Sequence, residues 1–222
     1  MGQDVVVSQT TTRQIDTVIF DLGGVLLKNG RQSDLVRRFP ADKAQAALRV
    51  FIGDYGADND HPWHRLERGE ISFDEVRKLN RVGLAELGIE IPAPAAPNRP
   101  LMSFEPDTEM IDLVVRLRAA GLRTSILTNN VREFRDLWRP LLPYDDLFDD
   151  IVDSHEVGLR KPNAAIYELA LTRLNAVARR SAFLDDVPSN VVAAERLGLF
   201  GILVDEDSAP AICTVERLAG LD

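Results

Sequence analysis

The stretch "VIFDLGGVLL", residues 18–27, runs three apolar residues into an aspartate, Asp21, and then reaches two glycines. A short apolar run that is rich in β-branched residues and bounded by glycine is typical of a buried β-strand that ends in a turn. In open parallel sheets, ligands bind beyond the carboxyl ends of the strands. The stretch therefore predicts the first strand of a sheet and places the Asp21 carboxylate where a ligand would bind.

Similar short runs recur along the chain, and helical patterns separate them. The predicted strands are "TVIF" (17–20), "TSIL" (124–127), "DIVD" (150–153), "AFL" (182–184) and "GILV" (201–204). In "TEMIDLVVRLRAAG", residues 108–121, apolar side chains at helical spacing share one face, and Gly121 can close the helix. This alternation predicts an α/β fold, with a parallel sheet covered by helices on both faces.

Residues 29–100 interrupt that alternation, because they are rich in charge and helical pattern and contain no convincing strand. Apolar residues recur there at three-residue spacing: Phe73, Val76, Leu79 and Val82. The segment ends in "IPAPAAPNRP", residues 91–100, whose prolines favour an extended connector. We therefore expect a core formed by residues 15–28 and 101–222, an inserted helical lobe at 29–100, and a flexible amino-terminal tail at 1–14.

Composition limits the classes of partner. The net charge of −9 argues against a nucleic-acid-binding protein, which needs a basic face to neutralise phosphates. The sequence contains no apolar run of the length that spans a membrane, so we expect no membrane partner. Cys213 is the single cysteine, which suits a reducing, cytoplasmic compartment, and we expect it to be a small buried side chain. The oligomeric state is left open.

Polar side chains follow the predicted strands, and a lysine opens one of the helices. These residues are Asp21, Thr128, Asn129, Lys161, Asp185 and Asp186. Carboxylates that lie close together repel one another unless a cation neutralises them, and oxygen ligands favour Mg²⁺. A carboxylate can also attack phosphorus and form an aspartyl-phosphate, while a threonine hydroxyl and a lysine can hold the phosphoryl oxygens. The pattern predicts phosphoryl chemistry on a small phosphorylated metabolite.

Four segments in this order resemble the motifs of the haloacid dehalogenase (HAD) superfamily. They are "VIFDLGGV" (18–25), "ILTNN" (126–130), "GLRKPNAAIYELAL" (158–171) and "FLDDVPSNVVAAERLG" (183–198). The branch that the chain resembles contains glucose-1-phosphatase-like enzymes and the amino-terminal phosphatase domain of bifunctional epoxide hydrolases. "WHRLERGEISFDEV" (63–76) is similar to that branch as well. The resemblance implies a Rossmann-like doubly wound core with an inserted helical cap, and Mg²⁺-dependent hydrolysis of a small phosphate monoester such as a sugar phosphate.

The resemblance also implies a role for each matching residue. Asp21 would be the nucleophile and a magnesium ligand, Gly23 would offer its backbone carbonyl to the metal, and Asp186 would be the second carboxylate ligand. Asp185 and Asn190 would hold these ligands in position without contacting the metal themselves. The phosphoryl group would be held by four residues: Thr128, Asn129, Lys161 and Gly24. Of these, Thr128 and Lys161 count with Asp21 as catalytic.

The chain departs from the resemblance at Gly23. Most phosphatases of the superfamily carry an aspartate there, which protonates the leaving oxygen and later activates water. General acid–base help of this kind is worth about 10² to 10⁴ in rate. Members of the branch that resembles this chain also tend to have glycine there. We therefore expect a substrate with a comparatively good leaving group.

A cap side chain could instead approach the leaving oxygen. His61, His64 and Glu67 are candidates, although a structural role is the simpler interpretation for each of them and for His155.

Two other functions are weighed. A catalytically degenerate relative would bind a phosphorylated ligand or a partner without turnover, and Gly23 permits this. A 2-haloacid dehalogenase would use Asp21 to displace halide without metal. The latter resembles a different first motif, with an aromatic residue where Gly23 stands and threonine where Val25 stands. The pair of acids at 185 and 186 also favours a metal-dependent phosphatase.

Overall fold

The structure is a computed structural model that describes residues 13–28, 35–90 and 104–221. Most of the expected amino-terminal tail and the whole proline-rich segment 91–100 lie outside the described residues. Within the described part, the backbone N–H of Gln14 donates to the carbonyl of Leu218 at 2.8 Å. The chain is therefore already attached to the last helix before the first strand begins.

Five parallel strands form one sheet in the order β3-β2-β1-β4-β5. The strands are β1 (Thr17–Phe20), β2 (Arg123–Thr128), β3 (Asp150–Asp153), β4 (Ser181–Asp185) and β5 (Phe200–Leu203). The central strand β1 is buried along its whole length, as its unbroken apolar run predicts. The order runs outward from β1 in both directions, so the strand order reverses between β1 and β4. The parallel sheet and the Rossmann-like arrangement expected from the sequence are confirmed.

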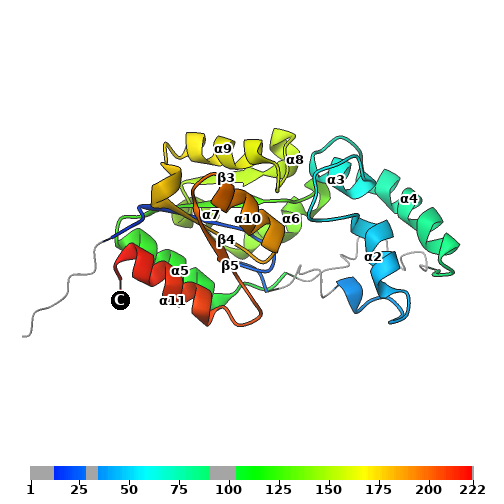
Figure 1. The fold of residues 1–222 in the computed structure, drawn as a ribbon, viewed down its shortest axis with the longest axis horizontal. Coiled ribbons are helices and arrows are strands. Elements are labelled where there is room, and N and C mark those ends of the chain that lie inside the picture. The colour runs from blue at the N-terminus through cyan, green and yellow to red at the C-terminus, as the bar shows by residue number, and fades with distance from the viewer. Residues whose placement is uncertain (1–12, 29–34, 91–103, 222) are drawn as a thin grey trace, which may run out of the picture.

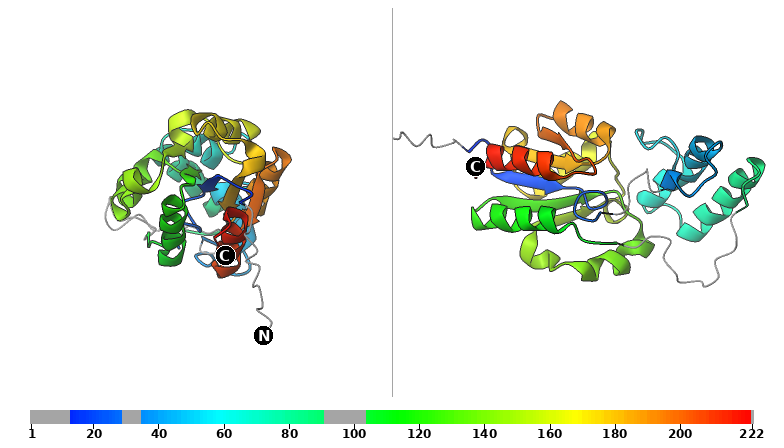
Figure 2. Two further views of the ribbon diagram at one scale, coloured as in Figure 1. Left: turned by 90° about the vertical axis from the view of Figure 1, so that its left-hand side faces the viewer. Right: turned by 90° about the horizontal axis from the view of Figure 1, so that it is seen from below.

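Helices cover both faces of the sheet (Figures 1 and 2). On one face, α5 (Thr108–Ala119) and α11 (Ala209–Ala219) pack against Val18 and Phe20 of β1. On the other face, α9 (Ala164–Arg173) and α10 (Pro188–Arg196) pack against Ile19. The alternation of side chains along a strand explains this division. The shorter elements are η1 (Arg132–Phe134), α6 (Arg135–Trp138), η2 (Arg139–Leu141), α7 (Tyr144–Leu147), α8 (Ser154–Val157) and η3 (Ala178–Arg180).

Between β1 and α5, three helices that are described in full form a separate group beside the sheet, which we call the cap (residues 35–90). They are α2 (Ala44–Ile52), α3 (Pro62–Glu67) and α4 (Phe73–Glu86). In Figure 1 they lie to the right of the sheet, beyond the end of β1 that leads into Asp21. The described part of the inserted segment is thus helical, while its expected boundaries at 29 and 100 fall on residues outside the description.

The buried face of α4 includes only part of the apolar series at three-residue spacing. Ser72 and Glu75 form a reciprocal capping box that starts the helix, but the residues buried beyond it are Val76, Asn80 and Leu84. Leu79 is 52% exposed and Val82 is 63% exposed. A strict three-residue spacing drifts around a helix of 3.6 residues per turn, whereas a four-residue spacing stays closer to one face.

Two further observations concern the surface. Cys213 is exposed, against expectation, because α11 buries Ala211, Val215 and Ala219, which leaves residue 213 on the opposite side of that helix. No helix of the described residues has both the length and the apolar content needed to cross a membrane.

Candidate active site

Asp21 stands at the carboxyl end of the central strand and is almost fully buried, with 8% of its surface exposed. Its backbone N–H donates to the carbonyl of Leu184, which extends the pairing of β1 with β4 by one residue. The backbone N–H of Leu22 donates to Asp21 Oδ1 at 2.7 Å. Strand pairing and the following turn therefore fix the orientation of the carboxylate.

Lys161 connects the two strand ends that carry carboxylates. Its Nζ lies 2.8 Å from Asp21 Oδ1 and 2.7 Å from Asp185 Oδ2, and its side chain is 1% exposed. Asn129 holds the lysine backbone from both sides: the N–H of Lys161 donates to Asn129 Oδ1 at 2.8 Å, and Asn129 Nδ2 donates to the Lys161 carbonyl at 2.9 Å. The residue after β2 thus positions the cation that the site needs.

Asp185 is fully buried and has several donors around its carboxylate. Asn190 Nδ2 lies 3.1 Å from each of its oxygens, and the backbone N–H of Val187 donates to Oδ1 at 2.8 Å. Asn190 is itself held, because its carbonyl accepts a bond from the Tyr167 hydroxyl at 2.9 Å. These contacts fix the Asp185 carboxylate beside Lys161, and the supporting role of Asp185 and Asn190 stays a prediction.

One ligand oxygen from each of Asp21, Asp185 and Asp186 lies within 4.8 Å of the others. All three donors are carboxylate oxygens, the ligand type that Mg²⁺ prefers. Among these three acids, Asp186 is the one only partly buried, and it lines a cavity that also reaches Asp21. The donor set therefore fits a hard divalent cation, with Asp21 and Asp186 placed to hold it.

The electrostatics of the cluster reflect burial and mutual repulsion. The pKa of Asp21 is raised to about 6, because burial and, to a smaller extent, the Asp185 carboxylate together outweigh the opposing charge of Lys161. For Lys161, burial favours a lower pKa, but the carboxylates of Asp185 and Asp21 outweigh it and raise the pKa above its usual value. The raised pKa keeps Lys161 protonated at neutral pH, and its positive charge favours the ionised form of Asp21.

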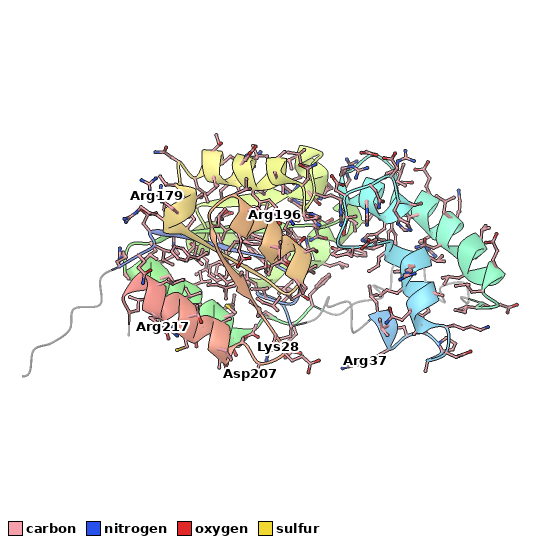
Figure 3. All side chains as sticks on the ribbon, viewed as in Figure 1. Lys28, Arg37, Arg179, Arg196, Asp207 and Arg217 are labelled. Carbon is pink, nitrogen blue, oxygen red and sulfur yellow. The ribbon has the colours of Figure 1, made fainter. Side chains whose placement is uncertain are left out.

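The structure brings Thr128 and Gly23 to the same cavity as Asp21, as expected. Thr128 is the last residue of β2 and is 2% exposed. Gly24 lies elsewhere: its N–H donates to the Leu27 carbonyl at 2.7 Å. It lines a different cleft with Lys28, Arg37 and Asp207, whose side chains are labelled along the lower edge of Figure 3. A phosphate contact by Gly24 stays a prediction and has no geometric support here.

Glu67 of the cap is already occupied by structural contacts. Its carboxylate accepts from the Tyr55 hydroxyl and from Trp63 Nε1, each at 2.8 Å, and from Arg160 Nε at 2.8 Å. Burial raises the pKa of Glu67, although all three partners favour its ionised form. The buried pair with Arg160 connects the cap to the residue directly before Lys161, so the Glu67 carboxylate already has three hydrogen-bond partners within the protein.

The three histidines also have structural partners. His61 caps α3 by accepting from the Trp63 N–H. His64 is fully buried within the cap, where its Nδ1 accepts a bond from the Asn59 N–H at 3.4 Å. His155 Nδ1 lies 2.8 Å from Asp153 Oδ1 at the end of β3.

Sequence reasoning missed Arg160 and the aromatic side chains that line the cavity. Arg160 is fully buried and contacts residues about a hundred positions earlier in the chain, including Glu67. The position of Arg160 directly before Lys161 was the one feature of the sequence that could have indicated its importance. The aromatic residues come from separate segments of the cap and the core, so their convergence has no local pattern.

Several characterised proteins are similar in sequence. The chain is 31% identical to acyl-CoA dehydrogenase family member 10 of Mus musculus over 94% of its own length, which is 19% of that protein. It is 29% identical to the sesquiterpene phosphatase astK of Aspergillus oryzae, with 91% of this chain and 95% of that one covered. It is 27% identical to bifunctional epoxide hydrolase 2 of Mus musculus, covering 90% of this chain and 38% of that protein. The chain thus spans only part of two of these three relatives.

Solved structures share the fold of this chain, and a family match over most of its length identifies the family to which it belongs. A HAD-like hydrolase from Porphyromonas gingivalis matches with a TM-score of 0.63 and 28% identity, over 92% of this chain and 98% of that one. A HAD enzyme from Bacteroides thetaiotaomicron, solved with magnesium and inorganic phosphate, matches with a TM-score of 0.60 and 21% identity, over 89% and 98%. Residues 15–198 match the family described as haloacid dehalogenase-like hydrolase. The chain belongs to the haloacid dehalogenase-like hydrolase family.

Proposed function

We propose that the protein is a Mg²⁺-dependent phosphatase that hydrolyses a small phosphate monoester through an aspartyl-phosphate on Asp21. The observation that carries this proposal is the buried Asp21 carboxylate, held by Lys161 at 2.8 Å and grouped with two further carboxylates at the strand ends. A nucleophile, a fixed cation and an oxygen ligand set are the parts that phosphoryl transfer to a carboxylate requires.

The reaction has two displacements at phosphorus. In the first, an Asp21 oxygen forms a bond to phosphorus, and the ester oxygen leaves with the bonding electron pair and takes up a proton from water. In the second, water attacks the phosphorus of the aspartyl-phosphate, which releases inorganic phosphate and restores the Asp21 carboxylate. Thr128 and Lys161 hold the phosphoryl oxygens in both steps. When bound by Asp21, Asp186 and the Gly23 carbonyl, Mg²⁺ supplies charge neutralisation for the approach of an anionic ester.

The relatives support phosphate esters as substrates. Besides the sesquiterpene phosphatase, the chain is 26% identical to a glyceraldehyde 3-phosphate phosphatase from Methanothermobacter thermautotrophicus over 94% of its length. These names concern chemically different alcohols, one a terpene and one a small polar triose. What they share is a phosphate monoester, and that shared group is the class proposed here. A sugar phosphate, the example expected from the sequence, is one member of it.

The test measures hydrolysis of 4-nitrophenyl phosphate with and without Mg²⁺. We expect metal-dependent turnover, and a loss of about 10³-fold or more in Asp21→Asn, because the nucleophile is removed. Asp153→Asn is the matched control, since Asp153 is also a buried carboxylate at a strand end but contacts His155 instead of the cluster. It should keep its activity.

A second measurement tests the intermediate. Protein incubated with radiolabelled acetyl phosphate and quenched in acid should carry an acid-stable acyl phosphate that hydroxylamine removes, and Asp21→Asn should carry none. Full activity in Asp21→Asn would contradict the proposal. Release of chloride from 2-chloropropionate without metal would point to the dehalogenase instead, and ligand binding without any turnover would point to the degenerate binder.

A further inference from the structure

A cavity of about 330 Å³ lies between the cap and the core and opens onto the active site. Its lining includes Asp21 and Asp186 at one side and a set of apolar residues from both parts of the chain. The aromatic members of that set are Phe39, Phe51, Trp63, Phe73, Phe104 and Phe134. A phosphoryl group at Asp21 would therefore have its ester substituent beside aromatic rings.

The aromatic rings form two walls. In the cap, Phe51 lies between Phe39 and Trp63, with ring centroids 6.0 Å and 5.7 Å apart. The other wall joins the cap to the core: Phe73 meets Phe134 edge-on at 5.3 Å, and Phe134 is 6.4 Å from Phe104. Because these six side chains are only partly buried, ring surface remains for a ligand to cover.

The polar ends of the cavity aromatics are directed to the protein. The Tyr55 hydroxyl and Trp63 Nε1 both donate to Glu67, so these residues offer their rings to the cavity while their donors are used. Asn129 is likewise engaged with the Lys161 backbone, and Asn130 Oδ1 accepts from the Val131 N–H. The charged lining residues outside the acidic cluster are Arg38 and Glu90.

We propose that the leaving group of the substrate is apolar: the protein hydrolyses the monophosphate of a hydrophobic alcohol or phenol and binds its hydrocarbon part between these two walls. This inference rests on the proposed phosphatase function and defines its substrate class. A sugar phosphate fits the cavity poorly, because its hydroxyls would exchange water for aromatic faces and lose their hydrogen bonds. The apolar leaving group therefore replaces the sugar phosphate expected from the sequence.

The test separates hydrophobicity from leaving-group chemistry. In a series of 4-alkylphenyl phosphates from methyl to hexyl, the acidity of the phenol stays nearly constant while the apolar area grows. We expect kcat/KM to rise about fourfold per methylene, which corresponds to about 0.8 kcal/mol, until the cavity is full. The gain should appear mainly as a lower KM, since binding away from the reacting atoms acts equally on the ground and transition states.

Binding without turnover gives an independent measurement. Titration calorimetry with alkylphosphonates, which lack the scissile P–O ester bond, should show affinity rising with chain length from methyl to hexyl. It should also show a negative heat-capacity change that grows with chain length, the mark of apolar burial. Glucose 1-phosphate should be a weaker competitor than hexylphosphonate.

Variants of the two walls identify the binding surface. In Phe39→Ala and Phe134→Ala, the ratio of kcat/KM for the hexyl substrate to that for the methyl substrate should fall about tenfold. Leu79→Ala is the control, because Leu79 is an apolar residue of the cap that lies 52% exposed and outside the cavity lining. Since both substrates are measured on the same preparation, any inactive fraction of a variant cancels in the ratio.

The two proposals fail in different ways. An active enzyme whose kcat/KM does not change with chain length, or that prefers glucose 1-phosphate, would overturn the apolar substrate and leave the phosphatase intact. Absence of hydrolysis for every member of the series, together with absence of an acyl phosphate on Asp21, would overturn the phosphatase. Unchanged ratios in both wall variants would show that the hydrocarbon binds elsewhere and would also overturn this inference.

Discussion

Gly23 lines the cavity beside Asp21 but has no side chain that could protonate a leaving oxygen. The nearby candidates in the cap do not replace it well. Glu67 accepts three hydrogen bonds, and burial together with Glu67 raises the pKa of Tyr55 well above its usual value, which makes that phenol a weak acid. The proposed reaction therefore depends on the leaving group more than it would with an aspartate at this position.

Restoring the acid should change that dependence. The backbone of Gly24 has a positive φ of 75°, but Gly23 is not among the residues with positive φ, so an L side chain is compatible with its conformation. In Gly23→Asp we expect the rate of hydrolysis of alkyl phosphates, whose alkoxides are poor leaving groups, to rise by about 10²-fold. The rate for 4-nitrophenyl phosphate, whose phenolate leaves readily, should change little. The measurement is the slope of log kcat/KM against leaving-group pKa, which should flatten. Gly23→Asn, which has no acid, should keep the original slope.

Lys161 should contribute to stability as well as to chemistry, because it separates two buried carboxylates. In Lys161→Met we expect the free energy of unfolding to fall by about 3–5 kcal/mol, since both acids lose their partner. Replacing Asp185 in the same chain, as Lys161→Met with Asp185→Asn, should recover about 1–3 kcal/mol of that loss. Denaturant unfolding of the single and double variants measures this coupling. Strictly additive effects would contradict a direct interaction.

The short helix α3 is the element that connects the cap to the active site. Glu67 at its end pairs with Arg160, whose guanidinium also lies 5.1 Å from the centre of the Tyr55 ring and donates to the Ala57 carbonyl. The next residue along the chain is Lys161. A displacement of α3 would therefore separate a buried ion pair, which holds the cap in register with Lys161.

The same helix carries a buried histidine that should make stability depend on pH. The pKa of His64 is lowered to about 4, because burial, with smaller contributions from the charges of Arg160 and His61, outweighs the opposing effects of the Ile52 backbone and Asp58. Between about pH 6.5 and 4 the unfolded chain binds a proton at this residue that the folded chain does not. Stability should therefore fall as the pH falls through this window, by up to about 1.4 kcal/mol per pH unit from this residue.

The matched variant is His64→Phe, which keeps an aromatic ring but cannot bind a proton. Denaturant unfolding at several pH values between 4 and 7.5 should show a shallower loss of stability on acidification in the variant than in the original chain. Above pH 7 the two curves should run parallel, because His64 is then neutral in both states. Parallel curves over the whole range would show that His64 titrates normally when folded.

The sequence was most informative where function and local structure depend on the same few residues. Asp21, Thr128 and Asp185 each stand at the carboxyl end of a strand, and parallel strands must bring such ends together. The buried side of α4 could not be predicted, because a spacing of three residues does not determine which neighbour the helix will face. The cavity could not be predicted from the sequence, since Phe39 and Phe134 line the same cavity only after the cap packs on the core.

At the scale of the whole molecule, the net charge of −9 and the convergence of three acids both favour the binding of a cation at the acidic cluster. A divalent cation between Asp21 and Asp186 would relieve repulsion that exists only when the strand ends are assembled. Because the unfolded chain has no such arrangement, binding energy would appear as stability of the fold. This gives the metal site a readout that does not depend on turnover or on knowing the substrate.

We therefore expect Mg²⁺ to raise the midpoint of thermal unfolding. At a free concentration 100 times the dissociation constant, the gain is about 2.7 kcal/mol, or about 5–10 °C for a domain of this size. Asp186→Asn should unfold at a temperature that Mg²⁺ barely changes, because it removes a ligand from the partly buried side of the cluster. Asp146→Asn, which changes the net charge equally but at an exposed position on α7, should respond to Mg²⁺ like the original chain. An equal response in all three proteins would place the bound cation away from Asp186 and would leave the acidic cluster without the role that its geometry supports.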